Sequence, residues 1–168
     1  MKLVLMIAIA VVLVIGAVAA IGAMLPKRHV ASRSAVFHAG REPLYALVAG
    51  TQTWRPDVKA CEAMEKDGRR FQRETDKHGH TILYEVEEPG PDRIVRRIAS
   101  EDLPYGGRWT VTFAPKDDGT QVRITEEGEV YNPIFRFVSK FILGQTASID
   151  AYLKAMGAAV GEDARIEN

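Results

Sequence analysis

The sequence contains a single cysteine, Cys61, among its 168 residues. A lone thiol has no partner within the chain, so the fold does not depend on an internal disulfide. The sequence also has no CxxC pair and no Cys/His spacing typical of a structural zinc site. We therefore expect Cys61 to be a small, half-buried side chain on a strand.

The chain has no excess of charge of either sign, because lysine plus arginine equals aspartate plus glutamate, at 22 each. Nucleic-acid binding needs a surplus of basic residues gathered on one face of the protein. We therefore predict that nucleic acid is not a partner.

The usual catalytic signatures are also missing. The sequence has no GxSxG, no phosphate-binding P-loop, no dinucleotide-binding GxGxxG and no HExxH. His78 and His80 would share one face of a strand and so approach a metal ion together. With Gly79 between them, however, they are expected to lie in an exposed turn. We predict no cofactor and no metal, and leave open whether the protein is an enzyme.

What the sequence does contain is a long apolar run, from Leu3 to Leu25, with no charged or strongly polar side chain. As a helix with a rise of about 1.5 Å per residue, this run would be about 33 Å long. That length is sufficient to cross the hydrocarbon core of a bilayer. Pro26 would end the helix. We predict that residues 1–26 form a single-pass membrane anchor, with residues 3–25 inside the membrane.

The alternative for this segment is a cleaved signal peptide. Lys2 would be its charged start, and Ala17-Val18-Ala19 would be the cleavage site. The apolar run continues past that site and exceeds the ~7–15 residues of a signal-peptide core, which favours the anchor. Lys27, Arg28 and Arg33 outweigh Lys2 and the amino terminus and so favour a cytoplasmic domain. Because the balance tips by about one charge, the side of the membrane stays open.

Residues 27–162 are predicted to form one α+β domain, followed by a flexible tail at 163–168. The domain begins with a strand at 30–38 and short helices at 40–48 and 51–58. Strands with a period of two follow at residues 69–75, 81–88, 93–100, 106–113 and 120–131. The short turns between them predict an antiparallel meander.

The last predicted element is a long amphipathic helix. Asn132 suits its N-cap and Pro133 its first helical position. Steps of about 100° per residue place ten apolar side chains on one stripe: Ile134, Phe137, Val138, Phe141, Ile142, Ile149, Tyr152, Leu153, Met156 and Val160. We expect this stripe to lie across the sheet, with Gly144 as a place where the helix can bend.

Several stretches carry a family resemblance: Ala35-Val36-Phe37, Pro43–Val48, Trp54–Val58, Gly107-Arg108-Trp109-Thr110 and Glu127–Pro133. Together with the order of elements, they resemble the SRPBCC superfamily (START-like or Bet v 1-like), in its polyketide cyclase/dehydrase and lipid-transport branch. The resemblance implies a helix-grip fold, in which a curved sheet of about seven strands wraps around the C-terminal helix and encloses an apolar cavity. Members bind hydrophobic molecules there, and a minority catalyse cyclisation or dehydration. The N-terminal anchor is not part of the family pattern.

Two polar residues stand in phase with apolar neighbours. Glu126 shares a strand face with apolar residues, and Gln145 falls in the centre of the helix stripe. A buried polar group needs a partner, so these side chains are candidates for orienting a ligand in the cavity. Alternatively, a β-bulge near Gly128 turns Glu126 outward, or Gln145 bonds to backbone freed near Gly144.

The remaining candidates for ligand contact are Arg96 and six aromatic residues, Trp54, Tyr84, Trp109, Phe113, Phe141 and Tyr152. Arg96 is expected to pair with Glu126 or to face a ligand carboxylate. The aromatic residues would form cavity walls or plain core. The resemblance places Trp54 near the mouth of the cavity.

These observations predict a membrane-tethered protein that binds or carries a hydrophobic small molecule or lipid. The rival hypothesis is a cyclase or dehydratase, in which Glu126 transfers a proton and burial raises its pKa. A third hypothesis, a tethered interaction module without a ligand, is favoured if side chains fill the interior.

Overall fold

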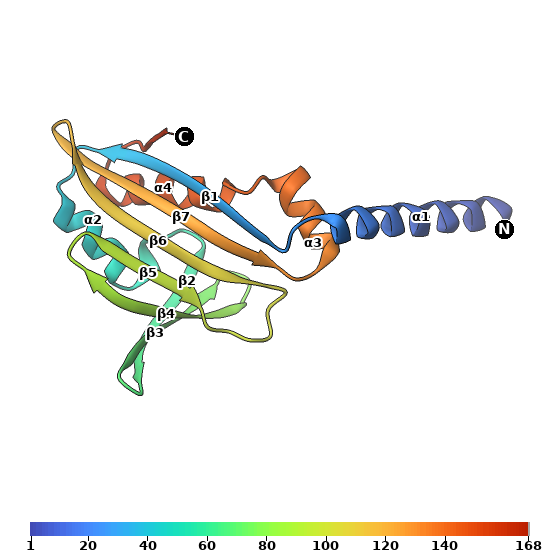
Figure 1. The fold of residues 1–168 in the computed structure, drawn as a ribbon, viewed down its shortest axis with the longest axis horizontal. Helices are drawn as coiled ribbons and strands as arrows, with labels where there is room; N and C mark the ends of the chain where they lie inside the picture. The colour runs from blue at the N-terminus through green and yellow to red at the C-terminus, as the bar shows by residue number, and fades with distance from the viewer. Residues whose placement is uncertain (168) are drawn as a thin grey trace.

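The computed structural model describes residues 1–167, with residues 88 and 89 described by backbone alone. The chain begins with α1 (Lys2–Met24), a helix that projects away from the rest of the molecule (Figure 1). This helix is long and apolar enough to cross a membrane, although signal sequences meet the same criterion. Leu25 adopts an extended conformation and ends it.

The rest of the chain is built around one eight-stranded antiparallel sheet in the order β2-β3-β4-β5-β6-β7-β1-β8 (Figure 1). The strands are β1 (Arg28–Phe37), β2 (Val58–Lys66), β3 (Arg69–Asp76), β4 (Thr81–Gly90), β5 (Arg93–Ile98), β6 (Tyr105–Lys116), β7 (Gly119–Val130) and β8 (Arg165–Glu167). From β2 to β7 each strand pairs with the next in sequence, and β1 closes onto β7 along its whole length. The predicted α+β class and the antiparallel meander are confirmed.

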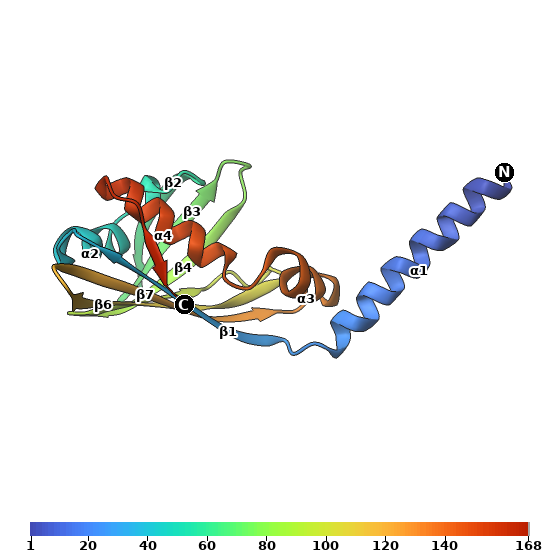
Figure 2. The same ribbon diagram turned by 90° about the horizontal axis from the view of Figure 1, so that it is seen from above.

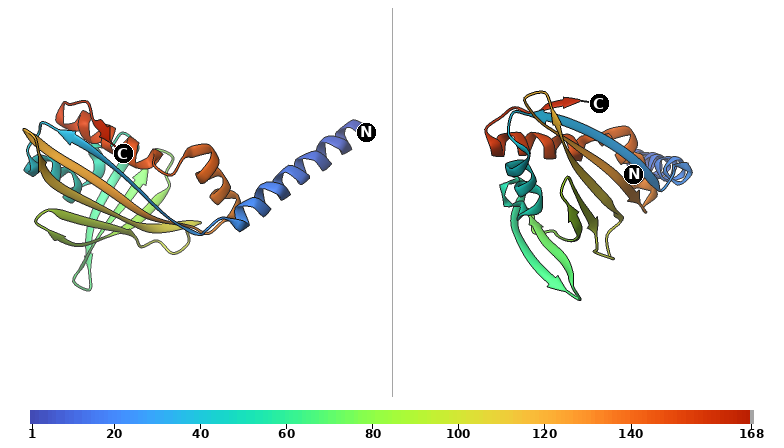
Figure 3. Two further views of the ribbon diagram at one scale, coloured as in Figure 1. Left: turned by 45° about the horizontal axis from the view of Figure 1, so that its top comes forward. Right: turned by 60° about the vertical axis from the view of Figure 1, so that its left-hand side comes forward.

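Helices cover the concave side of this sheet. The two short helices are α2 (Arg41–Ala49) and η1 (Gln52–Trp54), which connect β1 to β2. The sheet curves around α4 (Ala147–Val160), as Figure 2 and Figure 3 show. The face of α4 toward the sheet is completely buried at Ile149, Leu153 and Met156. These side chains pack on inner residues of the strands, among them Val111, Phe113, Val122 and Ile124.

Two strands differ from the sequence prediction. Strand β2 is an edge strand on which most side chains are exposed, so its sequence lacks a clear alternation. Cys61 lies on it, half-buried and free. Strand β8 occupies half of the expected flexible tail, 163–168, because Ile166 packs against the core and pairs with Ala35. The sheet therefore has eight strands instead of about seven, and residue 168 lies outside the described residues.

The predicted C-terminal helix is divided into parts. Its first part is α3 (Pro133–Val138), which continues as the π-helical turn η2 (Ser139–Leu143). As predicted, Asn132 caps α3, its side-chain oxygen accepting from the amide of Ile134 at 2.9 Å. Gly144 then ends the helical path with φ of 80°, a left-handed conformation that favours glycine. Gly144 thus separates two helices rather than bending one.

The helix α3 is fixed against the end of α1. Arg136 is buried, and its Nη1 donates to the backbone oxygen of Leu25 at 2.8 Å. Gly22 lies so close to α3 that an added Cβ would fall 1.9 Å from the backbone oxygen of Pro133. The first contact joins the Arg136 side chain to backbone and the second lies between two backbones, and together they hold the two helices in a defined arrangement.

Candidate functional site

A cavity of about 680 Å³ lies between the sheet and the helices α3, η2 and α4. Its walls are largely aromatic and apolar, and it falls within the size range of small-molecule sites. The sheet contributes lining residues from β1 and from β4 to β7, while the helices contribute others, among them Phe135, Val138, Leu143 and Tyr152. The interior is therefore not filled by side chains.

Glycines make room for the cavity at one end of the sheet. Gly107 on β6 pairs with Gly128 on β7, and both line the cavity. Gly107 has φ of +126°, and an added Cβ would lie 2.2 Å from the backbone oxygen of Glu127. At Gly128 an added Cβ would lie 2.3 Å from the His29 ring. Neither position therefore admits a side chain, and the pair contributes only backbone to the cavity wall.

Glu126 is the centre of a polar cluster in the cavity wall. One carboxylate oxygen accepts from the indole nitrogen of Trp109 at 2.9 Å and from the Ser148 hydroxyl at 3.2 Å. The other lies 3.3 Å from His29 Nε2. The β7 pairings run in unbroken register past Gly128, so within the described pairings no bulge turns Glu126 outward. Four elements thus bring a carboxylate, an indole, an imidazole and a hydroxyl to the cavity.

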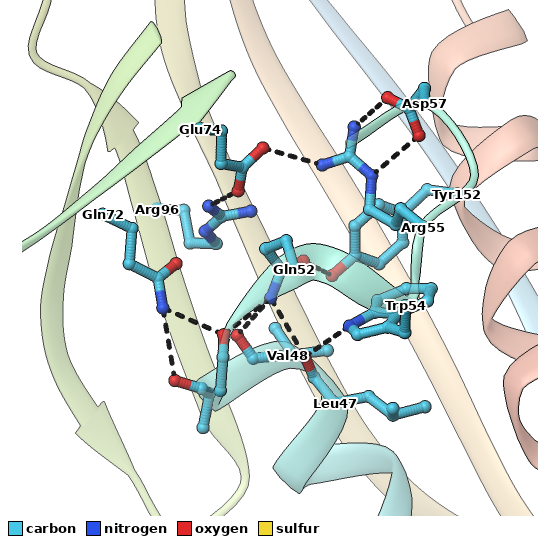
Figure 4. A network of polar contacts seen from close by, with 12 residues as sticks. Leu47, Val48, Gln52, Trp54, Arg55, Asp57, Gln72, Glu74, Arg96 and Tyr152 are labelled. Carbon is cyan, nitrogen blue, oxygen red and sulfur yellow. Dashed lines mark hydrogen bonds and ion pairs between the residues drawn. The ribbon is translucent and has the colours of Figure 1, made fainter. Parts of the chain in front are cut away.

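A second polar cluster lies farther across the sheet, as Figure 4 shows. Arg96 on β5 is 6% exposed and forms an ion pair with buried Glu74 on β3. Glu74 also accepts from Arg55 Nη1 at 3.1 Å, and Arg55 forms a two-point contact with Asp57. Burial opposes the charge on Arg55, but the hydrogen bond to Asp57 and the charge of Glu74 outweigh it and raise the Arg55 pKa.

The predicted pairing of Arg96 with Glu126 is wrong. Trp109 pairs with both residues in register, so its side chain stands between them on the inner face of the sheet. Its indole nitrogen donates a hydrogen bond to the Glu126 carboxylate, while Arg96 donates to the Glu74 carboxylate instead. Arg96 Nε has no hydrogen-bond partner among the described residues, and Arg96 lines the cavity.

Two tyrosines connect the clusters with the aromatic wall. The Arg96 guanidinium lies 4.5 Å from the centre of the Tyr84 ring. Tyr152 on α4 packs edge-on against Trp109 at 5.4 Å between ring centres. Burial raises the pKa of both Tyr84 and Tyr152 to about 12. Both phenols are therefore neutral near pH 7, and the Tyr84 hydroxyl can donate a hydrogen bond.

A buried amide that the sequence analysis did not single out holds Tyr152 in place. Gln52 is fully buried, and its side-chain oxygen accepts from the Tyr152 hydroxyl at 2.9 Å. Its amide nitrogen donates to the backbone oxygens of Leu47, Val48 and Gly50 (Figure 4). Because all these groups are satisfied, Gln52 ties α4 to the end of α2 and fixes the ring that borders the cavity.

Five of the nine candidates from the sequence line the cavity together: Tyr84, Arg96, Trp109, Glu126 and Tyr152. All five come from alternating inner positions of strands or from the buried face of α4. Hydrophobic periodicity was therefore sufficient to find them.

The other four candidates do not line this cavity. Trp54 lies behind Tyr152, with ring centres 5.1 Å apart. Phe113 is part of the closed core at 3% exposure. Phe141 is 57% exposed on η2, and Gln145 lies between η2 and α4, where the single helix was expected to continue. The break at Gly144 removes both from the stripe that α4 buries.

Five residues of the two clusters were not among the candidates: His29, Arg55, Asp57, Glu74 and Ser148. His29 pairs with Gly128 across β1 and β7. A polar residue opposite a glycine was the one pattern that could have indicated His29 as a site residue. Glu74 and Arg55 come together only through the β2–β3 hairpin and the turn after η1. Such contacts depend on tertiary structure, which sequence spacing does not report.

A curved antiparallel sheet that holds a C-terminal helix above a cavity defines a helix-grip protein. The chain belongs to the polyketide cyclase/dehydrase and lipid transport family, whose sequence model matches residues 29–161. This finding confirms the SRPBCC resemblance. A search of curated proteins found no match.

Solved structures with the same fold include a START superfamily protein from Mycobacterium smegmatis. It is 18% identical, with a TM-score of 0.63 over 79% of this chain and 97% of that one. Truncated norcoclaurine synthase from Thalictrum flavum is 14% identical, with a TM-score of 0.61 over 79% of this chain and 93% of that one. The protein TTHA0849 from Thermus thermophilus is 23% identical, with a TM-score of 0.60 over 79% of this chain and 96% of that one. These likenesses establish the fold.

Proposed function

We propose that this protein binds or carries a hydrophobic small molecule or lipid in the cavity between the sheet and the helices, while α1 tethers it to a membrane. The observation that carries the proposal is the cavity of about 680 Å³, bounded by aromatic and apolar side chains and two polar clusters. Such a composition suits a ligand that is mostly apolar and carries a few polar groups.

The proposed tether is α1. Its apolar residues are exposed all around the helix, for example Leu3 at 69%, Leu13 at 67% and Ile21 at 45%. Leaving this surface in water is unfavourable by about 25 cal/mol per Å², whereas a bilayer would cover it. Lys27 and Arg28 follow the helix, where they would meet lipid phosphates, and their charge favours a cytoplasmic domain.

The polar clusters define what the ligand would present. The Glu126 carboxylate accepts hydrogen bonds, so it suits a ligand hydroxyl or amine. Arg96 Nε and the neutral Tyr84 hydroxyl donate, so they suit a carbonyl or carboxylate oxygen. In register, Arg96 and Glu126 are two strands apart, which corresponds to about 10 Å.

Native mass spectrometry of the full chain in mild detergent tests the proposal, followed by titration with the apolar dye 1-anilinonaphthalene-8-sulfonate. We expect a retained lipid-like molecule, and dye binding that this molecule displaces. Glu126→Gln should weaken retention about tenfold, the equivalent of one hydrogen bond to a charged group. Glu127→Gln is the matched control, because Glu127 lies on the outer face and pairs with Arg108. If no apolar molecule is retained and no dye binds, the binding function is refuted.

A second candidate function is a cyclase or dehydratase acting on a hydrophobic substrate. The observation that favours it is the contact of 3.3 Å between Glu126 and His29, since a carboxylate beside an imidazole can exchange a proton with a bound substrate. In that case Glu126→Gln would abolish turnover of a polyketide-like substrate and yet retain binding. The hypothesis of an interaction module without a ligand is disfavoured by the cavity.

A further inference from the structure

The helical segment α3–η2 exposes a patch of large apolar side chains. Beyond Met24, the described residues include eight exposed large apolar side chains. Five of these lie within ten positions: Ile134, Phe135, Phe141, Ile142 and Leu143. The last three are adjacent and are 57–68% exposed. A contiguous patch of this kind marks an interaction site on a protein surface.

The exposure of this patch follows from the break at Gly144. A continuous helix would have placed Phe141 and Ile142 on the same stripe as the buried residues of α4. Instead, η2 forms a π-helical turn, and Gly144 redirects the chain with φ of 80°. The fold thus turns large apolar side chains away from the core. Contact with water would not stabilise that arrangement.

Helix α3, which carries Ile134 and Phe135, lies beside the C-terminal end of α1 (Figure 1), and η2 continues from it. Arg136 and the close approach of Gly22 to Pro133 hold α3 there. If α1 spans a bilayer, its end lies at the level of the headgroups, and the contacts bring α3–η2 to the same level. Lys140 on η2 is exposed, like Lys27 and Arg28, so basic side chains flank the apolar ones. This combination is typical of a helix that lies in a membrane interface.

The same segment forms part of the cavity wall. Phe135 and Leu143 are both exposed and also line the cavity, and Val138 and Ser139 line it between them. Apart from Ser139, the part of the wall that α3 and η2 form is therefore apolar, and two of its apolar side chains are open to the surroundings. A ligand that passes between these side chains would move from lipid to the cavity without crossing water.

We propose that α3–η2 is a second membrane contact, inserted in the interface of an anionic bilayer, and that Phe135 and Leu143 form the portal through which the ligand enters from the lipid. This inference rests on the proposed function, because it takes α1 as the membrane span. It adds a docking surface and a route of entry that the tether alone does not require.

Depth-dependent quenching tests the contact in the full chain. Cys61 is replaced by serine, and a single cysteine carrying a bimane fluorophore is placed at position 142, which is 68% exposed and so tolerates a label. The protein is reconstituted in vesicles of phosphatidylcholine with phosphatidylglycerol that contain doxyl-labelled lipid. A label at position 13 in α1 is the positive control. A label at position 118, in the β6–β7 hairpin at the end of the sheet far from α1, is the negative control (Figure 1).

We expect the label at position 142 to be quenched by shallow doxyl groups, the label at 13 by deep ones, and the label at 118 by neither. If 13 is quenched while 142 behaves like 118, the second contact is refuted and the tether stands. If 13 is not quenched either, the tether itself is refuted, and with it this inference. Leu143→Asp provides a second measurement: it should slow exchange of a fluorescent fatty acid between protein and vesicles at least tenfold, whereas Asp118→Ala should not.

Discussion

The two ends of the concave face of the sheet are built from the same pair of strands, yet one end is filled and the other is hollow. The paired inner residues of β6 and β7 run Phe113 with Val122, Val111 with Ile124, Trp109 with Glu126, and Gly107 with Gly128. The first two pairs are buried core, the third borders the cavity, and the fourth leaves space. Side-chain volume along one strand pair therefore decides where the core stops and the cavity begins.

The helical cover changes at the same place. Over the filled end, α4 buries Ile149, Leu153 and Met156 against the strands. Over the hollow end, α3 and η2 expose much of their apolar surface. The same residue types therefore serve as core or as surface, according to whether large side chains face them from the sheet.

The largest effect is expected from weakening the filled end. Ile124→Ala removes a fully buried side chain and should lower the free energy of unfolding by about 2–5 kcal/mol, because a cavity remains. Urea unfolding of the full chain in detergent measures this change. The matched control is Ile142→Ala, 68% exposed, which should change stability by about 0.5 kcal/mol at most. Equal losses in the two variants would contradict the contrast between the ends.

The stability of the protein at alkaline pH tests the tyrosines at the boundary between the filled end and the hollow end. Burial raises the pKa of Tyr84 and Tyr152 from 10.0 to about 12, so between these values the folded protein holds protons that the unfolded chain releases. Stability from this source is fully present below pH 10 and lost as pH rises toward 12, by up to about 3 kcal/mol per tyrosine. Urea unfolding at successive pH values measures the loss of stability. The variant Tyr84→Phe should lack the part of this loss that comes from Tyr84. A variant that loses as much stability as wild type would disprove the assignment.

The next effect concerns the hollow end. Gly107→Ala places a Cβ at φ of +126° and 2.2 Å from the backbone oxygen of Glu127. We expect a loss of about 1–3 kcal/mol from backbone strain. Thermal unfolding checks this value. Gly68→Ala is the control for positive φ without a steric clash, since nothing lies within 4 Å of its added Cβ, and it should cost less.

The smallest effect is expected at the partner glycine. Gly128→Ala would force the His29 ring to move and so break its contact with Glu126. The cost should be about 1 kcal/mol, the value of one hydrogen bond. The diagnostic measurement is the NMR chemical shift of the His29 ring, which should change in Gly128→Ala and remain unchanged in Gly68→Ala. An unchanged ring signal in both variants would show that the contact is absent in solution.

Much of the site followed from the sequence because strand alternation is a local property. Glu126 and Trp109 stand in phase with apolar residues, and the structure turns both into the cavity. Their partners did not follow. His29 meets Glu126 only because β1 pairs with β7, whose residues lie far away along the chain. Arg96 pairs with Glu74 because the Trp109 ring separates it from Glu126.

The class of fold, the apolar N-terminal helix and the inner faces of the long strands were predictable from the residues, because each depends on a periodic pattern within one segment. The edge strands β2 and β8, the two polar clusters and the division of the C-terminal helix became apparent only in three dimensions. Those features depend on which segments meet. The apolar stripe was continuous in sequence, but the sheet beneath it carries large side chains at one end and glycines at the other. The chain therefore buries the half of the stripe on α4 and exposes much of the half on α3 and η2.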